Sequence, residues 1–450
     1  MPNSKNNKQK LTVINPDAAG IDIGSREHYV CVSADRDEKN VRKFAAFTSD
    51  LKAMRDWLKK CGVKTIAMES TGVYWIPVFQ VLETSGFEVV LVNARHVKNV
   101  PGRKTDVQDC QWLQQLHSYG LLSGSFRPKD QICELRSFTR QRDRLTKNAA
   151  THVNRMQKAL NEMNIQLHHV ISDITGVTGI SIIKAIIAGE RDANKLAAFR
   201  DYRIKSDVKT IIKALEGDYR KEHLIVLKQA LDIYEFYLKQ ISECDKEIEA
   251  CYKEFDKRGD GKLINNTKQY RSKNAPKFDL QQSLYNAAGV DFTAIPGLSE
   301  LSVQTIVSEV GLDMDKWSTE KHFTSWLGLS PSNRITGGKV FDTRTRKVEN
   351  KASMAFRMAA FNLGRGKSAL AGFYRRIKSR AGVPKAITAT ARKLACMFYR
   401  LLRYGQNYIE KGVEIYEKQY QEIMVKNFQK QATKLGFSVI KIEHSLDSVC

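Results

Sequence analysis

Four acidic residues occupy positions at which a metal-dependent nuclease keeps its carboxylates. Asp22 lies in an apolar stretch, Glu69 ends the apolar run 65–68, and Asp106 and Asp109 stand where a helical pattern begins. Residues three apart share one helix face, with Cβ atoms roughly 5–6 Å from each other. If two strand ends bring Asp22 and Glu69 to that face, the four carboxylates form an oxygen cage suited to Mg²⁺ or Mn²⁺.

Each acid also has a structural alternative. Asp22 could terminate a strand, Glu69 could pair with a basic neighbour, and Asp106 could cap a helix with help from Thr105. The combination is more specific than any one residue, because two strand acids precede a helix acid pair in a very basic chain. Two divalent ions about 3.5–4 Å apart could stabilise the attacking and leaving oxygens at a phosphodiester.

The charge of the chain indicates the kind of partner. The net charge of the 450 residues is +24, which favours nucleic acid first and an anionic membrane surface second. No apolar run approaches the ~20 residues of a membrane span, and the N-terminus lacks the apolar core of a signal peptide. Eight cysteines occur without a CxxC pair, which predicts a reduced cytoplasmic protein without structural zinc.

The elements that must position these acids alternate between strand and helix. The sequence predicts strands over 20–33, 43–48, 65–69 and 88–92 and helices over 51–61 and 76–85. Gly62 and Gly86 stand where helix C-caps are expected. This order predicts a mixed sheet flanked by helices.

Beyond residue 132 the pattern becomes helical. Apolar residues alternate by four and three over 149–167 and 224–241, and the second series resumes at Ile248 after Asp245 interrupts it. Such spacing predicts coiled-coil helices, paired within the chain or between subunits, with an ordinary bundle core as the alternative. Residues 257–277 hold seven Lys/Arg against one Asp, which predicts a flexible basic linker or an arm that orders on nucleic acid.

Two further features favour contact with phosphates. Ile-Thr-Gly-Val at 174–177 is similar to Ile-Pro-Gly-Leu at 295–298, and both are turns that open a helix, as in a helix-hairpin-helix. A simple corner between bundle helices is the alternative for each copy. Residues 339–393 hold fifteen Lys/Arg against two acids, which predicts a basic helical surface that neutralises phosphates.

A second group of residues could supply a nucleophile. Thr336 offers a hydroxyl, Gly337 and Gly338 let a ligand approach the backbone, and Arg334 and Lys339 offer positive charge. A hydroxyl beside phosphate-binding groups can attack phosphorus if a base or metal activates it. The residues alone favour a simpler interpretation, a Gly-Gly hairpin turn that leads into Lys339.

From residue 18 to residue 405 the motifs resemble, in order, those of IS110-family transposases, closest in layout to the IS1111-type branch. Three motifs resemble the family's DEDD domain, which has a RuvC-like, RNase H-related fold: Gly-Ile-Asp-Ile-Gly at 20–24, Met-Glu-Ser-Thr-Gly-Val-Tyr at 68–74 and Lys-Thr-Asp-Val-Gln-Asp at 104–109. Others resemble its C-terminal transposase domain: Ile-Pro-Gly at 295–297, the stretch 323–329, Ser-Pro-Ser at 330–332 and Thr-Gly-Gly-Lys at 336–339.

The resemblance implies that Asp22, Glu69, Asp106 and Asp109 bind Mg²⁺ and that a hydroxyl ahead of the two glycines becomes joined to DNA. It implies a dimer or tetramer whose catalytic site combines domains of two subunits, and a non-coding bridge RNA that specifies donor and target DNA. The expected location is the prokaryotic cytoplasm, at the nucleoid. The predicted nucleic-acid-binding residues are Arg334, Gly337, Gly338, Lys339, Arg344 and Arg346.

One departure concerns the nucleophile, because the family's serine aligns with Thr336. The threonine methyl group stiffens χ1 and crowds in-line attack. Three interpretations remain: Thr336 attacks, Ser330 or Ser332 substitutes for it, or strand exchange is impaired. The glycines and lysine retained around Thr336 favour the first.

Other functional classes fit parts of the pattern. A RuvC-like endonuclease or junction resolvase would use metal-activated water and tolerate the loss of Thr336. The motif around Asp22 also resembles the first phosphate loop of actin-like sugar kinases and ATPases, but the sequence lacks their second Asp-x-Gly loop and Gly-rich adenosine loop. In a non-catalytic nucleic-acid-binding scaffold, Asp22→Asn would leave all activity unchanged.

The sequence therefore predicts a multidomain protein with an α/β N-terminal part and a mostly helical remainder. The expected parts are a basic tail over 1–17, a RuvC-like domain over 18–128, a coiled-coil region over 129–290 with a basic linker at 256–278, a transposase domain with a helix-hairpin-helix-like element over 291–405, and a helical tail over 406–450.

Overall fold

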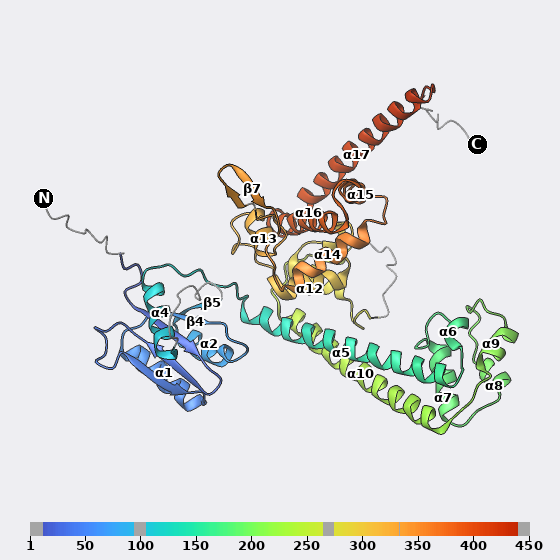
Figure 1. The fold of residues 1–450 in the computed structure, drawn as a ribbon, viewed down its shortest axis with the longest axis horizontal. Helices are drawn as coiled ribbons and strands as arrows, with labels where there is room; N and C mark the ends of the chain where they lie inside the picture. The colour runs from blue at the N-terminus through green and yellow to red at the C-terminus, as the bar shows by residue number, and fades with distance from the viewer. Residues whose placement is uncertain (1–11, 94–104, 264–273, 333, 440–450) are drawn as a thin grey trace. The chain divides into compact units, whose positions relative to one another are not determined.

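The chain forms two compact units, Met1–Arg127 and Pro128–Cys450. The computed structural model describes residues 12–93, 105–263, 274–332 and 334–439. Each unit has its own buried core, and Figure 1 shows a sheet in the first unit and mostly helices in the second. The finer division into five parts stays a prediction.

The first unit is built on a five-stranded mixed sheet with strand order β3-β2-β1-β4-β5. Its strands are β1 (Ala18–Ile23), β2 (Glu27–Cys31), β3 (Val41–Ala45), β4 (Thr65–Glu69) and β5 (Glu88–Val92). β1, β2 and β3 pair antiparallel, whereas β4 lies parallel to β1, and β5 parallel to β4.

The single strand predicted over residues 20–33 is wrong, because the chain reverses between β1 and β2. The Gly24 N–H donates to the Glu27 carbonyl at 3.1 Å, and a Cβ at Gly24 would lie 2.5 Å from that oxygen. Gly-Ser-Arg at 24–26 is therefore a tight turn, and the polar residues Glu27 and His28 follow it.

Helices cover both faces of this sheet. α1 (Thr48–Lys60) and α2 (Trp75–Glu83) enclose one apolar core with the strands, and α4 (Asp106–Ser118) packs on the opposite face. Gly62 follows α1 with φ +66°, and its N–H donates to the Lys59 carbonyl. This glycine ends the helix as the sequence predicts.

The second unit contains two long helices, α5 (Asp130–Glu162) and α10 (Lys221–Glu254), which pack along each other. The predicted pairing of the two helical segments therefore occurs within the chain. Asp245 interrupts the apolar series because it accepts a hydrogen bond from Arg142 of α5 in the interior of the pair. The seam differs from the prediction at Leu238, which is 43% exposed.

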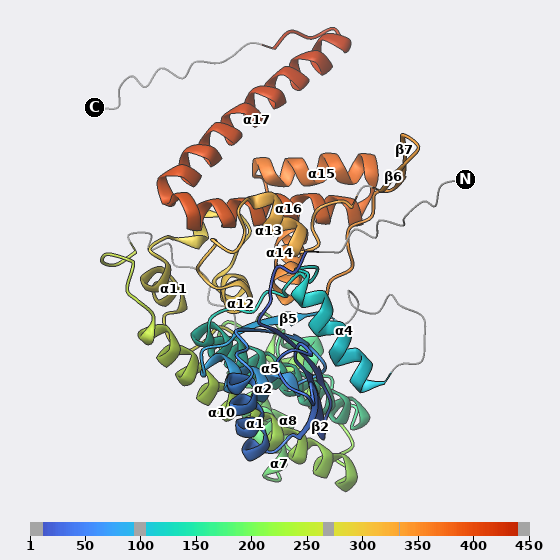
Figure 2. The ribbon, with the colours of Figure 1, turned by 90° about the vertical axis from the view of Figure 1, so that its left-hand side faces the viewer.

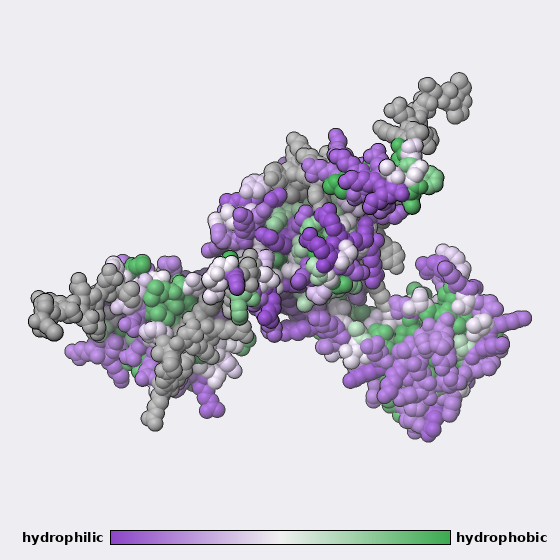
Figure 3. All heavy atoms as spheres, turned by 45° about the horizontal axis from the view of Figure 1, so that its top comes forward, coloured by the Kyte–Doolittle hydropathy of each residue, from purple (hydrophilic) through white to green (hydrophobic). Residues whose placement is uncertain are grey.

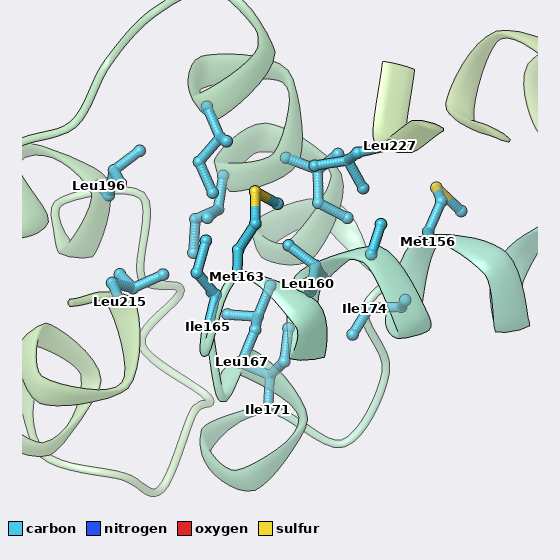
Figure 4. Close-up of a cluster of buried hydrophobic side chains, with 14 of the residues drawn as sticks. Met156, Leu160, Met163, Ile165, Leu167, Ile171, Ile174, Leu196, Leu215 and Leu227 are labelled. Carbon is cyan, nitrogen blue, oxygen red and sulfur yellow. The ribbon is translucent and has the colours of Figure 1, made fainter. Parts of the chain in front are cut away.

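Four short helices join the far ends of α5 and α10: α6 (Leu167–Val170), α7 (Val177–Ile187), α8 (Ala193–Ala197) and α9 (Val208–Leu215). We call residues 163–220 the knob. Leu167, predicted to continue the α5 seam, belongs to the separate helix α6. Figure 4 shows that Met163, Ile165, Leu196 and Leu215 converge on one apolar core inside the knob.

The remainder of the second unit is a helical domain. Its elements are α11 (Leu280–Ala288), η1 (Phe292–Ala294), α12 (Glu300–Val310), α13 (Glu320–Trp326), β6 (Arg334–Thr336), β7 (Lys339–Asp342), α14 (Lys351–Leu363), α15 (Ala369–Ala381), α16 (Val383–Tyr404) and α17 (Gln406–Lys434). Figure 2 shows α15 and α16 side by side. The core is aromatic: Phe398 packs against the rings of Phe292, Phe323 and Phe356.

The two similar turns of the sequence both open a helix, as predicted, but their glycines differ. Gly176 is the N-cap of α7 with φ −73°. Gly297 has φ +86°, and α12 begins only after its own N-cap, Ser299. Among the described residues, no helix is long and apolar enough to cross a bilayer.

Candidate catalytic site

Asp22 and Glu69 lie at the carboxyl ends of neighbouring parallel strands. The register pairs Ile21 of β1 with Met68 of β4, so the two acids follow side by side. Side chains alternate between the faces of a sheet, and Ile21 and Met68 are buried in the core that α1 and α2 enclose. Asp22 and Glu69 therefore occupy the face covered by α4.

Asp106 and Asp109 lie in the first turn of α4. Thr105 is the N-cap, and its hydroxyl accepts a hydrogen bond from the Gln108 N–H at 3.3 Å. The N-cap of α4 is therefore Thr105 and not Asp106, which was the structural alternative for that residue. Carboxylates in a first turn are also favoured by the helix dipole.

Gly20 allows α4 to lie directly against β1. A Cβ at this position would stand 2.4 Å from the Cys110 carbonyl oxygen and 2.3 Å from the Gln114 nitrogen, distances that no side chain tolerates. Gly20 and Asp22 share one face of β1 because they are two residues apart. The close approach that Gly20 permits therefore brings the first turn of α4 towards Asp22.

A buried hydrogen bond fixes the other end of α4. His117 Nε2 lies 2.8 Å from the Thr65 hydroxyl at the start of β4, and His117 is only 5% exposed. Burial lowers the pKa of His117, so the ring is neutral near pH 7. Sequence reasoning missed both this pair and the packing role of Gly20.

The pKa of Asp22 reflects the burial of its carboxyl group and the charges of the other three acids. It is raised to about 6, first because burial disfavours the charged carboxylate. The negative charges of Asp106, Asp109 and Glu69 then raise it further. The sheet and α4 thus bring all four predicted acids to one place in the first unit.

This donor set fits a hard divalent cation such as Mg²⁺ or Mn²⁺, which prefers carboxylate oxygens. A cation would also offset the repulsion that raises the pKa of Asp22. Within the described ranges, however, no three His, Cys, Asp or Glu side chains meet closely enough to form a metal-binding group as they stand. Binding a cation would therefore require the carboxylates to move closer together.

Thr336 lies in the second unit, at the tip of a two-stranded hairpin. Thr336 pairs with Lys339 across the turn, and Gly337 and Gly338 have φ +56° and +75°. Two successive left-handed residues are typical of a type I′ turn, so the Gly-Gly hairpin expected from the residues is present. The side chains of Thr336 and Lys339 are exposed.

The two alternative nucleophiles lie just before this hairpin. The Ser330 hydroxyl lies 3.0 Å from the hydroxyl of buried Thr324. Ser332 is exposed, and its N–H donates to the Arg344 carbonyl at 3.0 Å. Ser330 is therefore engaged by the domain core, whereas Ser332 is open to solvent.

The predicted basic residues follow or begin the same hairpin. Arg334 is the first residue of β6. Arg344 pairs with Asp342 of β7 at 3.2 Å and is otherwise solvent-exposed. Arg346 donates to the Trp326 carbonyl, at the end of α13, at 3.2 Å.

Comparison with protein families decides the identity of the chain. A transposase model named for the DEDD domain of IS110 elements matches residues 19–165. A second model, described as transposase of the IS116/IS110/IS902 family, matches residues 291–375. The chain belongs to the IS110 family of transposases. No curated protein matches it.

In this IS110-family transposase, the residues of the predicted catalytic site fall in two separate family matches. Asp22, Glu69, Asp106 and Asp109 fall within the first match, and the hairpin of Thr336 falls within the second. Family membership makes the chain a transposase of an insertion sequence, with DNA as its substrate. Residues 166–290 lie outside both matches.

Proposed function

We propose that this transposase cuts and rejoins DNA through a covalent intermediate on Thr336, with Asp22, Glu69, Asp106 and Asp109 as ligands for Mg²⁺ or Mn²⁺. The observation that carries the proposal is the placement of the four acids. Asp22 and Glu69 follow paired positions of neighbouring strands on the face that α4 covers, and Asp106 and Asp109 lie in the first turn of α4. When bound, the cation would supply positive charge to the scissile phosphate and lower the barrier to its displacement.

In the proposed step the Thr336 Oγ1 attacks phosphorus in line. A Thr336–phosphate ester bond forms while the bond from phosphorus to one DNA oxygen breaks. The proton of the threonine hydroxyl passes to water, and the departing DNA oxygen takes up a proton from water and leaves as a DNA hydroxyl group. The ester conserves the energy of the broken bond, so a DNA hydroxyl can later reverse the step and rejoin the strand.

The hairpin supports this role in three ways. Its tight turn leaves Thr336 exposed, and Lys339 lies directly across the turn, where its ammonium can stabilise charge on the phosphate. Ile335 and Phe341 are 62% and 82% exposed, as expected of a hairpin that packs against a partner. We therefore propose an oligomer, a dimer or tetramer, in which the hairpin of one subunit meets the acids of another.

Adduct trapping tests the nucleophile. With cleavable DNA and Mg²⁺, the unmodified protein and Thr336→Ser should form a covalent protein–DNA adduct, whereas Thr336→Ala should not. Ser332→Ala is the matched control and should retain the adduct. An adduct that survives Thr336→Ala but disappears in Ser332→Ala would show that Ser332 is the nucleophile.

The same experiment separates the competing enzyme mechanism. A RuvC-like endonuclease that uses activated water would release free DNA ends, would form no adduct, and would cut normally with Thr336→Ala. A non-catalytic scaffold would bind DNA equally with or without Asp22→Asn and would cut in neither form.

We further propose that a bridge RNA guides the transposase, on the basis of its family resemblance and its net charge of +24. Purification of the full chain from cells that carry its element should recover one discrete RNA encoded in the adjacent non-coding DNA. Recovery of random RNA fragments alone would reject guidance without affecting the cleavage chemistry.

A further inference from the structure

The knob is a folded element that neither family match includes. Its residues lie between the two matched ranges, apart from the first three, 163–165. Its apolar interior is complete, with Ile182, Ile183, Leu196 and Leu215 fully buried. Apolar side chains left on its surface are therefore not needed for its core.

One loop on the knob presents an aromatic side chain to solvent. We call residues 199–207 the Tyr202 loop. Tyr202 is 85% exposed, Phe199 at the start of the loop is 46% exposed, and Val208, which follows the loop as the first residue of α9, is 48% exposed. Val177, the first residue of α7, is 77% exposed. Figure 3 shows the knob as a mainly hydrophilic surface interrupted by apolar patches.

Hydrogen bonds order the backbone of the Tyr202 loop, although the Tyr202 ring itself is exposed to solvent. Arg200 donates to the carbonyls of Ser206 at 3.0 Å and Ile204 at 2.5 Å, which closes the loop from inside. The Asp201 N–H donates to the Thr178 hydroxyl at 3.1 Å, which fixes the loop to α7. An ordered backbone with an exposed ring loses little entropy when it binds a ligand.

A second set of contacts orders the residues on either side of the ring. The Asp201 carboxylate accepts from the Arg203 backbone N–H at 3.0 Å and from its guanidinium at 2.8 and 3.1 Å. This places the guanidinium 5.7 Å from the centroid of the Tyr202 ring. A planar cation thus lies beside the exposed ring.

The segment that carries the ring is basic. Residues 191–213 contain seven Lys/Arg and three Asp, a net charge of +4. All three aspartates are engaged locally: Asp192 and Asp207 cap α8 and α9, and Asp201 binds Arg203. Lys205, Lys209 and Lys213 remain exposed, and the last two lie one turn apart on α9.

We infer that the Tyr202 loop binds unpaired nucleotides, with a base stacked on Tyr202 and neighbouring phosphates near Lys205, Lys209 and Lys213. Aromatic rings beside basic side chains bind single strands in this way, because every base has a face that can stack. A base can stack on Tyr202 only if it is unpaired. We therefore expect the loop to bind single strands and not a fully paired duplex. A second copy of the chain fits less well, because it carries the same net positive charge.

The inference rests on the proposed function only in that both require nucleic acid, so its test measures binding without cleavage. The full chain, kept in chelator, is irradiated with a single-stranded oligonucleotide that carries 5-iodouridine, and the cross-linked peptides are mapped. We expect a cross-link at Tyr202. Tyr202→Ala should remove it and weaken binding of the oligonucleotide by roughly fivefold or more, whereas Tyr202→Phe should bind as the unmodified chain does.

A charge-matched pair of variants tests the lysines. Neutralising Lys205, Lys209 and Lys213 to glutamine should weaken binding and flatten its dependence on salt. The same change at Lys158, Lys228 and Lys239, which are exposed on α5 and α10, should have a smaller effect. Thermal melting should be unchanged in all variants, because none of these side chains is buried.

Two results would overturn the inference. The first is cross-linking confined to other parts of the chain, with affinity unchanged by Tyr202→Ala. The second is a loss of oligomer mass in sedimentation with Tyr202→Ala while oligonucleotide binding persists, which would assign the loop to contact between copies. Both results come from binding measurements without cleavage. They can therefore be interpreted even if separate assays show that the protein does not exchange DNA strands.

Discussion

The two parts of the proposed catalytic site are held by very different means. In the first unit, the backbone fixes each acid: Asp22 and Glu69 end paired strands, and Asp106 and Asp109 begin a helix that packs on the sheet at Gly20. In the second unit, Thr336 lies in a two-stranded hairpin with exposed side chains on either side of the turn.

This difference separates two requirements of the chemistry. Carboxylates that repel one another must be held together by the fold, because nothing in their own interaction favours proximity. A nucleophile that enters a site from elsewhere must instead stay accessible. The acids are therefore expected to couple catalysis to the stability of their unit, whereas changes in the hairpin should affect catalysis alone.

Asp22→Asn should give the largest effect. Loss of one charged ligand should reduce DNA cleavage by at least roughly 10²–10³-fold, the loss typical when one electrostatic stabiliser of a transition state is removed. Stability should change in the opposite direction, because the substitution removes a partly buried charge that three neighbouring acids disfavour. In chelator, the variant should melt at a higher temperature than the unmodified protein.

Magnesium sharpens this prediction. A ligand that binds only the folded state raises its stability, so adding Mg²⁺ should raise the melting temperature of the unmodified protein. Asp22→Asn should respond less. Equal responses in the two proteins would show that the cation binds elsewhere.

Gly20→Ala should be the next most damaging change. Its Cβ would overlap the backbone of α4, so the helix must move, and overpacking of this kind costs about 1–3 kcal/mol. Both the melting temperature of the first unit and DNA cleavage should fall. Gly124→Ala is a matched control, because its Cβ would meet only Val90 Cγ1, at 3.4 Å. Similar losses in the two variants would argue against the packing role of Gly20.

Gly337→Ala tests the other side of the comparison. A left-handed conformation costs a non-glycine residue roughly 1–2 kcal/mol, but a Cβ there meets no other atom within 4 Å. The hairpin should distort, so adduct formation should fall while the melting temperature stays nearly unchanged. Gly337→Asn should restore much of the activity, because Asn-Gly favours the same turn. A large fall in melting temperature would instead place the hairpin within the folded core.

Local patterns in the sequence predict the elements of the first unit well. β4 and β5 have the predicted bounds because each is a short apolar run between polar ends. The four acids are predicted from the same kind of pattern, because they stand within or at the end of a strand or in the first turn of a helix. The turn at Gly24 was missed although Gly-Ser-Arg-Glu-His at 24–28 is a run of small and polar residues.

Contacts between distant residues were not predictable. Arg142 and Asp245 are 103 positions apart, and nothing near Asp245 in the sequence explains a charge in an apolar seam. Gly20 belongs to a recognisable motif, but its packing against Cys110 and Gln114 depends on where α4 lies. The knob was missed because its helices are too short to establish a clear period.

Substitution of two arginines near the hairpin should have the smallest effects on the protein. The two substitutions should differ in their effect on stability. The Arg344 side chain is 90% exposed and pairs with Asp342 of β7, so Arg344→Ala should change stability by less than about 0.5 kcal/mol. Arg346 donates to the end of α13, so Arg346→Ala should cost about 1 kcal/mol. If both arginines contact phosphate, each variant should reduce the salt dependence of DNA binding by about one charge. A binding defect in Arg346→Ala without a change in salt dependence would mean that this arginine acts only through the fold.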